Sequence, residues 1–466
     1  MDKAGIPFLS ASELSELIKK REVSPVEAAE AYLERIEALN GKLHAYLTVC
    51  GDEALRAARE AEQALARGEY RGPMHGVPVA LKDHFPTAGI RTTLGSPIFN
   101  DFVPDEDATV VANLKSAGAI LLGKLNLAEF ATTALSHAFE TPRNPWDQER
   151  HPGGSSSGSG VATAAFLCAV SLGGDTGGSV RAPASWCGLV GLRPTWGRVS
   201  RYGAVRGLWS MDTFGPLTRT VEDCAMTLQA IAGYDPKDPY MSDLPVPDYR
   251  RALDGNIRGI RVGVVEELLY SGIVDPEVRE AVSLSAKVLG DLGASVEEVS
   301  IPLASNGGTI SAALRVEASM THRELVRNRL REISHDNRIG YLTLSIIPAQ
   351  AYYKAQKLRA LLRQQVLEAL DNVDVLVSPT IGVAAQKIER DPVIDAKGKG
   401  SRNPWFFTRA FSLANVPTVS VPCGFTSQNL PIGLQIAGRP FQDAAVLKVA
   451  HAYEQATDWH RRKPPV

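Results

Sequence analysis

Apolar residues in the first part of the chain recur at helical spacing, every three or four positions. The pattern covers residues 10–68, in "SASELSELIKK", "SPVEAAEAYLERIEALN" and "DEALRAAREAEQALARGE". Ser10 and Ser24 are candidate N-caps. Ser24 is followed directly by Pro25 and, three residues after the cap, by Glu27, which is the pattern of a capping box. We therefore expect residues 10–68 to form helices that wrap the core.

From residue 72 the pattern changes to short apolar runs separated by helical segments. The runs are "HGVPVALKDHF", "AILLGKLNL", "FLCAVSLGG", "GIRVGVV", "VDVLVSP", "PTVSVPCGF" and "PIGLQIAG". Strands that alternate with helices indicate an α/β architecture. We expect one domain over residues 1–466, with a single large mixed β-sheet flanked by helices on both faces. Within it we expect a catalytic core over residues 72–240 and a less regular, variable region over residues 300–405 that faces the substrate.

The composition is that of an ordinary globular protein and excludes several classes. The 466 residues are 44% hydrophobic and 22% charged, with a net charge of −2 and no basic patch, which argues against nucleic acid or an anionic membrane as a partner. The five cysteines lack metal-ligand spacing, so neither a zinc site nor a disulfide framework is expected. We find no signal-peptide pattern and no long apolar run, so the cytoplasm is the expected location.

A glycine- and serine-rich stretch, "HPGGSSSGSG" at residues 151–160, admits several interpretations. A flexible linker is disfavoured because apolar helical residues follow at once. A dinucleotide-binding pattern would need glycine at the position of Thr163. Gly154 to Gly158 match the G-x-S-x-G nucleophile elbow with Ser156 at its centre, but the preceding "NPWDQERHPG" does not form the strand that this motif requires.

A further interpretation connects this stretch with two others. Upstream lies "GVPVALKDH" at residues 76–84, and downstream lies "GGDTGGSVR" at residues 173–181, which places Ser179 24 residues after Ser155. With these three motifs in this order and at this spacing, the chain resembles the amidase signature family. The resemblance continues in "GLVGLRPTWGRVSRYG", "DTFGPLTRTVEDCA" and "LPIGLQIAG" and covers most of residues 10–455. It implies the amidase signature fold and the hydrolysis of an amide C–N bond.

The resemblance also implies a serine–serine–lysine mechanism. Ser179 is the implied nucleophile, and Ser155, next to a non-proline cis peptide bond, passes the proton of Ser179 to Lys82. Lys82 ends an apolar run and is expected to be buried. To act as a base at neutral pH, its pKa has to fall from about 10.4 by roughly three units, and burial has this effect.

Backbone N–H groups are expected to stabilise the oxyanion, because glycine lets several of them converge on one point. By resemblance, the donors are the N–H groups of Thr176, Gly177, Gly178 and Ser179. The resemblance further indicates that Asp175 and Arg181 form an ion pair that braces this turn. Ser156 is expected to support the site from the neighbouring loop.

Three positions depart from the family pattern. His84 stands where the family usually has Asn, Ser157 where it prefers Gly, and Gly174 where it prefers Thr. None of these changes removes a candidate catalytic group, but each alters loop shape or hydrogen bonding around one. His84 is a candidate substrate-binding residue, and a loop histidine with solvent access is the alternative.

An aromatic cluster formed by Trp405, Phe406 and Phe407 is a further departure. The stretches "AYYKAQKLR" and "PIGLQIAG" resemble the amidotransferase branch of the family, in which an Asp stands three residues before the equivalent of Thr408. Here that position is Trp405. Trp405 and Phe406 are candidates for the wall of an apolar substrate pocket, and core packing is the alternative.

We therefore expect an amidohydrolase of linear C–N bonds that acts on a small amide, anilide or carbamate with an apolar or aromatic group. The glutaminase subunit of a tRNA-dependent amidotransferase is the alternative, and the residue at position 405 speaks against it. No metal and no organic cofactor is expected. The expected partner is the small amide or carbamate substrate, without nucleic acid or membrane, and a homodimer is left open.

Overall fold

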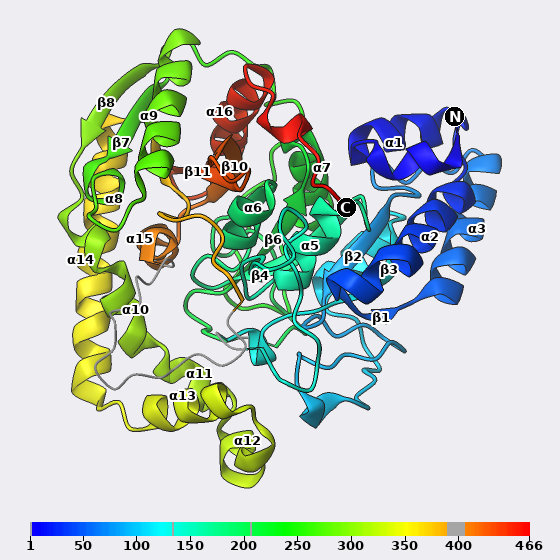
Figure 1. Cartoon of the computed structure of the whole chain (residues 1–466), viewed down its shortest axis with the longest axis horizontal. Coiled ribbons are helices and arrows are strands. Elements are labelled where there is room, and N and C mark those ends of the chain that lie inside the picture. Colours follow the sequence, from blue (N-terminus) through cyan, green and yellow to red (C-terminus); the bar gives the residue numbers. More distant parts are fainter. Residues whose placement is uncertain (1, 133–134, 206, 389–405) are drawn as a thin grey trace.

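A single sheet runs through the protein from near its N-terminus to near its C-terminus. The computed structural model describes residues 2–132, 135–205, 207–388 and 406–466 (Figure 1). Its strands are β1 (Tyr46–Val49), β2 (Pro78–Lys82), β3 (Ile120–Leu125), β4 (Val170–Asp175), β5 (Val190–Arg193), β6 (Thr213–Thr218), β7 (Arg261–Val265), β8 (Ser295–Val299), β9 (Val375–Pro379), β10 (Thr418–Phe425) and β11 (Pro431–Gly438). They form one 11-stranded sheet in the order β1-β3-β2-β4-β6-β5-β10-β11-β9-β7-β8.

The sheet is mixed, as the sequence predicts. Strand β2 pairs in parallel with β3 and β4, and β7 pairs in parallel with β8 and β9. The pairs β1–β3, β4–β6, β6–β5, β5–β10, β10–β11 and β11–β9 are antiparallel. The predicted fold class, an α/β protein with one large mixed sheet, is therefore confirmed.

Helices pack against the sheet. They are α1 (Ala11–Lys19), α2 (Pro25–Leu43), α3 (Gly51–Ala66), α4 (Thr109–Ser116), α5 (Ser157–Ala164), α6 (Arg181–Cys187), α7 (Val221–Ile231), α8 (Glu266–Leu269), α9 (Pro276–Asp291), α10 (Gly307–Leu314), α11 (Val316–Thr321), α12 (Arg323–Asn328), α13 (His335–Ser345), α14 (Ala349–Asn372), α15 (Phe406–Ala414) and α16 (Asp443–Gln455). Helix α5 packs on α6 and α7 packs on α16, while α6 and α16 both contact β10 and β11. In Figure 1, α1–α3 and α10–α14 lie on opposite sides of the molecule.

The N-terminal helices begin where their sequence signals predict. The side chain of Ser10 caps α1 and that of Ser24 caps α2, each within a complete capping box, and Pro25 occupies the first turn of α2. The sequence missed β1 between α2 and α3, because this strand has only four residues and pairs at the edge of the sheet with β3. The N-terminal residues 10–68 thus not only form helices but also add an edge strand to the sheet.

The region from residue 300 is more regular than the sequence indicates. Its described part contains α10–α14 and β9, and α14 alone spans 24 residues. The expected irregularity is therefore wrong for these residues. Helices α10–α13 are short, and their apolar positions are too often interrupted to show a helical pattern in the sequence.

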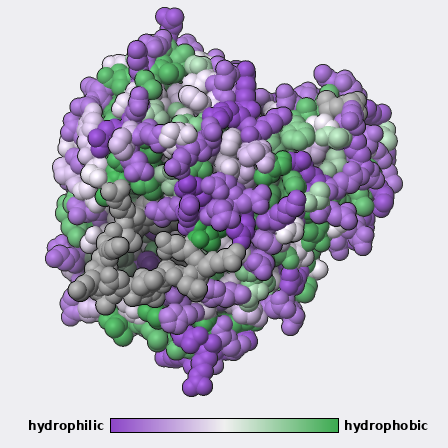
Figure 2. Space-filling view, in the orientation of Figure 1, coloured by the Kyte–Doolittle hydropathy of each residue, from purple (hydrophilic) through white to green (hydrophobic). Residues whose placement is uncertain are grey.

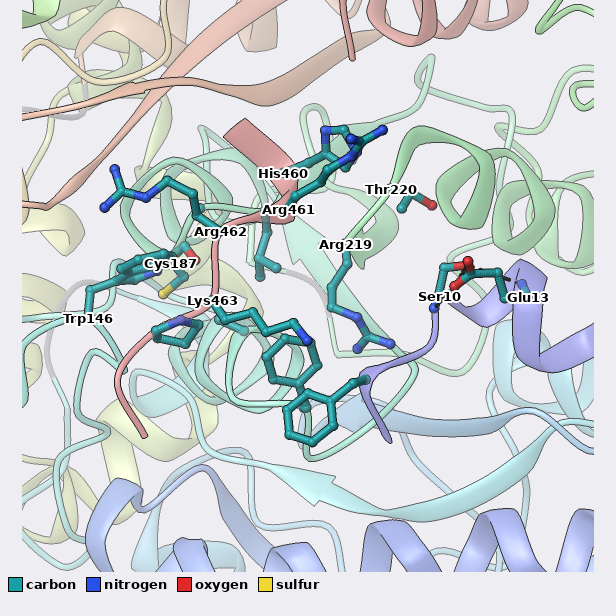
Figure 3. Close-up of a pocket in the computed structure, with 16 residues that line it drawn as sticks. Ser10, Glu13, Trp146, Cys187, Arg219, Thr220, His460, Arg461, Arg462 and Lys463 are labelled. Atoms are coloured by element: carbon teal, nitrogen blue, oxygen red, sulfur yellow. Dashed lines mark hydrogen bonds between the residues drawn. The ribbon is translucent and has the colours of Figure 1, made fainter. Parts of the chain in front are cut away.

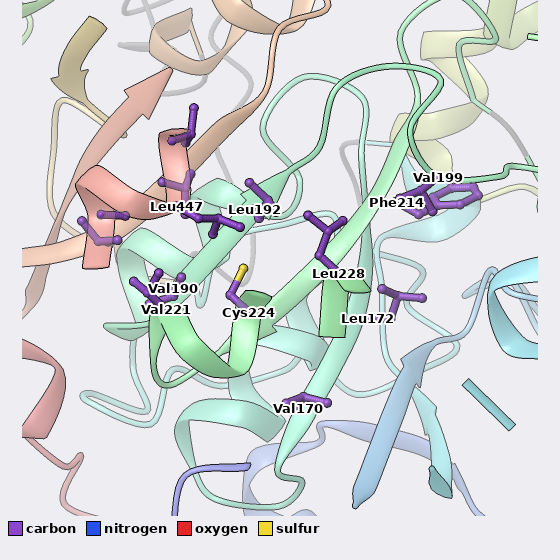
Figure 4. Packing of buried hydrophobic residues seen from close by; sticks show 14 of the residues in the cluster. Val170, Leu172, Val190, Leu192, Val199, Phe214, Val221, Cys224, Leu228 and Leu447 are labelled. Carbon is purple, nitrogen blue, oxygen red and sulfur yellow. The ribbon is translucent and has the colours of Figure 1, made fainter. Parts of the chain in front are cut away.

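The core lies between the central strands and their helices (Figure 4). Val170 and Leu172 of β4, Val190 and Leu192 of β5 and Leu447 of α16 are each at most 1% exposed. Strands buried on both faces carry nearly continuous apolar residues, which explains why the central strands can be recognised in the sequence. This packing fixes the ends of β2 and β4, where the candidate catalytic residues lie.

The outer surface in the view of Figure 2 is mostly hydrophilic, with small scattered hydrophobic patches. Within the described residues, no helix is both long and apolar enough to cross a lipid bilayer.

Candidate active site

Lys82 and Ser155 meet in the interior of the protein. Lys82 is the last residue of β2 and is 0% exposed, and Ser155 stands just before α5. The Lys82 Nζ donates a hydrogen bond to the Ser155 Oγ at 2.8 Å. The peptide bond between Gly154 and Ser155 is cis. Two of the three residues that the resemblance connects are therefore in direct contact, although 73 positions separate them.

The surroundings of Lys82 favour its neutral form. Burial lowers its pKa to about 7, and the charges of Asp212 and Asp175 oppose this effect. No carboxylate in the described part of the chain lies within 4 Å of its amino group. A substantial fraction of Lys82 is thus unprotonated at neutral pH, as a general base requires.

The loop that carries Ser179 is held by Asp175. This carboxylate accepts hydrogen bonds from the N–H groups of Gly178 at 2.7 Å and Val180 at 3.2 Å, and from the Arg181 Nε at 3.0 Å. Burial alone would raise the pKa of Asp175, but the charges of Arg181 and Arg193 hold it well below its usual range. The charged Asp175 therefore fixes the turn between β4 and α6.

Three of the four predicted oxyanion donors have no partner among the residues that the structure describes. The N–H of Gly178 is the exception, because it donates to Asp175. Across the described ranges, nothing accepts a hydrogen bond from the N–H groups of Thr176, Gly177 or Ser179. These three groups remain available to a substrate oxygen.

The two serine loops lie against each other. The N–H of Ser156 donates to the carbonyl oxygen of Ser179 at 3.3 Å, and its hydroxyl donates to the carbonyl oxygen of Gly174 at 3.3 Å. Ser155 is buried, whereas Ser179 is only half-buried. The contact brings the Ser155 loop beside the half-buried Ser179.

The departures at residues 84 and 174 form a matched pair. His84 is buried at 3% exposure, and its Nε2 lies 2.6 Å from the place that a Cβ on Gly174 would take. Burial and the nearby charge of Lys82 hold the pKa of His84 well below its usual range. The large neutral ring at position 84 is therefore accommodated by the absent side chain at position 174, and a solvent-exposed loop histidine is excluded.

The aromatic cluster lies partly outside the described residues, since Trp405 is among those that are not described. Phe407 is fully buried and its ring fills the space above Gly382. Phe406 is half-buried and its ring centroid lies 4.2 Å from that of Phe407. Phe407 thus belongs to the core, and a substrate contact of Trp405 or Phe406 stays a prediction.

Sequence reasoning missed two charged residues next to the site. Arg193 ends β5 and donates to Asp175 Oδ1 at 3.3 Å and to the carbonyl oxygen of Met211 at 2.7 Å. Asp212 accepts from Thr176 Oγ1 and from the N–H of Leu208, and burial raises its pKa. A signal existed for Arg193: like Lys82, it is a cation at the end of an apolar strand.

The protein also contains a cavity of about 340 Å³ away from these residues (Figure 3). It lies between the N-terminal 3-10 helix Lys3–Phe8 and the C-terminal residues, and Arg219 and Lys463 reach into it. None of the candidate catalytic side chains lines it. No group of three or more His, Cys, Asp or Glu residues within the described ranges could hold a metal ion.

Comparison with known proteins identifies the family of the chain. The family model described as Amidase matches residues 27–447. A glutamyl-tRNA(Gln) amidotransferase subunit from Moorella thermoacetica is 43% identical, over 98% of both chains. The crystal structure of the subunit of the same name from Thermotoga maritima is 36% identical, with a TM-score of 0.82 over 97% of this chain and 95% of that one. A bacterial aryl acylamidase of the amidase signature enzymes is 26% identical, with a TM-score of 0.88 over 97% of this chain and 98% of the other.

These relatives overturn the predicted partners. The prediction of a small amide or carbamate as the partner, without nucleic acid, is wrong. The names of the relatives describe them as subunits of an amidotransferase and include a tRNA. The physical reason is that net charge reports only on direct electrostatic contact with nucleic acid.

With the match over most of its length and full-length relatives above 40% identity, the chain belongs to the amidase signature family and is an amidohydrolase acting on C–N bonds.

Proposed function

We propose that this protein hydrolyses the side-chain amide of glutamine, as the glutaminase subunit of a tRNA-dependent amidotransferase. The observation that carries the proposal is the 43% identity to an amidotransferase subunit, which extends over 98% of both chains. The buried contact between Lys82 and Ser155 supports an active rather than a degenerate subunit. The comparisons therefore favour the glutaminase subunit over the small-amide hydrolase, although Trp405 stands where the amidotransferase branch has Asp.

In the proposed reaction, Ser179 is the nucleophile. Its Oγ attacks the amide carbon, and its proton passes through the hydroxyl of Ser155 to the neutral Nζ of Lys82. The negative charge on the former carbonyl oxygen is stabilised by the free N–H groups of Thr176, Gly177 and Ser179. The burial of Lys82, with no carboxylate partner in the described part of the chain, supports its role as base.

The second half of the reaction returns the proton. Lys82 gives it back through Ser155 to the leaving nitrogen, the C–N bond breaks, and ammonia departs from an ester on Ser179. Water then attacks the ester carbon, with Lys82 again accepting the proton. That proton returns through Ser155 to the Ser179 Oγ as the ester C–O bond breaks, and glutamate leaves. Asp175 and Arg181 hold the nucleophile loop throughout, and the proposed steps use no metal or organic cofactor.

The test is ammonia release from L-glutamine. It is measured for the purified chain and for the chain assembled with the remaining subunits of a bacterial amidotransferase and glutamyl-tRNA, with Ser179→Ala as the blank. We expect release that depends on Ser179 and increases on assembly. Hydrolysis of anilides or carbamates by the chain alone, with no release from glutamine in either state, would refute the proposal.

A further inference from the structure

The cavity between the N-terminal 3-10 helix and the C-terminal residues has an excess of positive charge (Figure 3). Four of the residues that line it are cations: Arg219, Arg461, Arg462 and Lys463. Glu13 is the only acidic side chain among the described residues that line it. The N–H and the hydroxyl of Ser10 donate to Glu13 Oε2 at 2.8 and 2.9 Å, so this carboxylate is engaged in the capping box of α1.

Two of the four cations have partners outside the cavity. The Arg461 Nη1 lies 2.9 Å from Asp458 Oδ1, and the Arg462 guanidinium lies 3.8 Å from the ring centre of Phe425. Arg219 and Lys463 have no carboxylate within 4 Å among the described residues. In Figure 3 their side chains extend toward each other from opposite sides of the cavity. Both therefore direct their charge at the same part of it.

Two phenylalanine rings carry these two charges. The ring centroids of Phe8 and Phe166 lie 4.8 Å apart. The Lys463 Nζ stands 4.5 Å from the centre of the Phe8 ring, and the Arg219 guanidinium stands 4.9 Å from the centre of the Phe166 ring. The negative faces of aromatic rings attract cations, which stabilises both charges without a carboxylate.

The backbone of Phe166 shows that this arrangement is held in place. Its φ of 59° lies in the left-handed region, which a bulky side chain rarely adopts. Such strain persists only where the surrounding structure fixes it, and it is concentrated at ligand sites and other functional positions. The Phe8–Phe166 pair is therefore a constrained part of the fold.

A third cation lies beside the same rings. The guanidinium of Arg35, on α2, stands 4.9 Å from the centre of the Phe8 ring, and its Nε donates to the carbonyl oxygen of Ala165 at 2.9 Å. Burial lowers the pKa of Arg35, and the charge of Arg219 lowers it further. Because like charges repel each other in a poorly solvated place, an anion bound there would remove this cost.

We propose that this cavity binds a small organic phosphate, with the phosphate group between Arg219 and Lys463. A phosphate monoester carries about two negative charges at neutral pH and so neutralises both cations, whereas a carboxylate carries a single charge. It also accepts the paired hydrogen bonds that a guanidinium offers.

The rest of the cavity fits an apolar or aromatic body on the phosphate. Its volume of about 340 Å³ is larger than a phosphate group needs, and Trp146, Leu189 and Pro464 give its wall an apolar part. No candidate catalytic residue lines the cavity, so the inference does not rest on the proposed function.

Phenyl phosphate is the probe, because it joins a doubly charged group to an aromatic ring. Inorganic phosphate lacks the ring, and benzoate lacks the second charge. Calorimetric titration of the full chain is carried out at about 0.15 M salt, where attraction between exposed charges is screened. We expect one site that binds phenyl phosphate more tightly than either of the other two, together with a rise in melting temperature.

Variants of the lysine test the position of the phosphate. Lys463 is exposed, so Lys463→Gln keeps the fold, and we expect it to weaken phenyl phosphate binding by about tenfold or more. Lys287→Gln, on α9, is the matched control, since Lys287 is an exposed lysine that does not line the cavity, and binding should stay as in the wild type.

Arg219 requires a milder change, because it also donates to the carbonyl oxygens of Cys168 at 3.0 Å and of Leu9. Arg219→Lys keeps the charge without the paired donors, and we expect weaker binding than in the wild type. No binding of phenyl phosphate to the wild type, equal losses in Lys463→Gln and Lys287→Gln, or equal affinities for phenyl phosphate and benzoate would overturn the inference.

Discussion

Two buried lysines lie near the ends of neighbouring parallel strands and have different surroundings: Lys82 is the last residue of β2 and Lys124 is the last but one of β3. Lys82 on β2 and Lys124 on β3 are both 0% exposed. The Lys124 Nζ lies 3.0 Å from Asp83 Oδ1 and donates to the carbonyl oxygen of Phe85 at 2.8 Å and to Thr92 Oγ1 at 2.7 Å. Lys82 has the hydroxyl of Ser155 and no carboxylate within 4 Å among the described residues.

The difference teaches that burial alone does not make a base. Burial lowers the pKa of both amines, but at Lys124 the charge of Asp83 is the largest opposing effect. At Lys82 the opposing charges of Asp212 and Asp175 are not in contact with the amine, and its pKa falls to about 7. Because its counter-charges are not in contact with it, Lys82 can take up a proton as a base. Because Lys124 is in direct contact with Asp83, it stabilises the fold as an ion pair.

Replacing the unpaired lysine gives the largest expected effect on the reaction. In Lys82→Met, kcat/KM falls by about 10²–10⁴-fold, because the proton acceptor is gone. The melting temperature does not fall, since no buried charge is left without its partner. Steady-state assays with thermal unfolding check both statements, and a variant that retains activity within tenfold of the wild type would exclude Lys82 as the base.

Replacing the paired lysine affects the fold instead. Lys124→Met leaves the carboxylate of Asp83 buried and unpaired, and we expect the free energy of unfolding to fall by about 3–5 kcal/mol. Urea unfolding measures it, and Asp83→Asn in the same chain should recover part of the loss. If Lys124→Met unfolds like the wild type, the ion pair contributes no stability and the contrast between the two lysines fails.

Much of this contrast could not be derived from the sequence. Lys82 was identifiable because its motif precedes those of Ser155 and Ser179 in the order that resembles the amidase signature family. Lys124 also stands in an apolar run, yet no motif connected it with Asp83, which is its partner only because β2 and β3 are adjacent in the sheet. Local patterns predict elements, whereas the charge beside a buried group depends on which elements pair.

The same limit applies around the nucleophile. The caps at Ser10 and Ser24 and the strand that ends at Asp175 were readable, since each depends on nearby residues. Arg193 reaches the site from β5 and Asp212 from the position before β6, and the fit of His84 into the space at Gly174 joins two segments. In the sequence, His84 and Gly174 stand out only as departures from a family pattern, and Arg193 and Asp212 belong to no motif.

The packing beside Lys82 gives a smaller expected effect. Gly174→Thr places a side chain where the His84 ring lies, and we expect a loss of about 1–3 kcal/mol in the free energy of unfolding. His84→Asn in the same chain should restore most of it, because the two positions are in contact. Gly272→Thr is the control, since nothing in the described structure lies within 4 Å of its added Cβ. Losses that simply add in the double variant would contradict the matched pair.

The smallest expected effect concerns the distant charges that act on Lys82. Because the protonated amine cannot act as a base, kcat/KM of the wild type should fall as pH drops below about 7, the pKa of Lys82, and level off above it. Asp212→Asn removes a negative charge that raises this pKa, so the midpoint should move to lower pH by about one pH unit or less. Asp107→Asn removes a charge that acts on Lys124 and should leave the midpoint in place. A pH profile that moves equally in both variants, or upward in Asp212→Asn, would mean that the titrating group is not Lys82, because of the two charges removed only that of Asp212 acts on its amine.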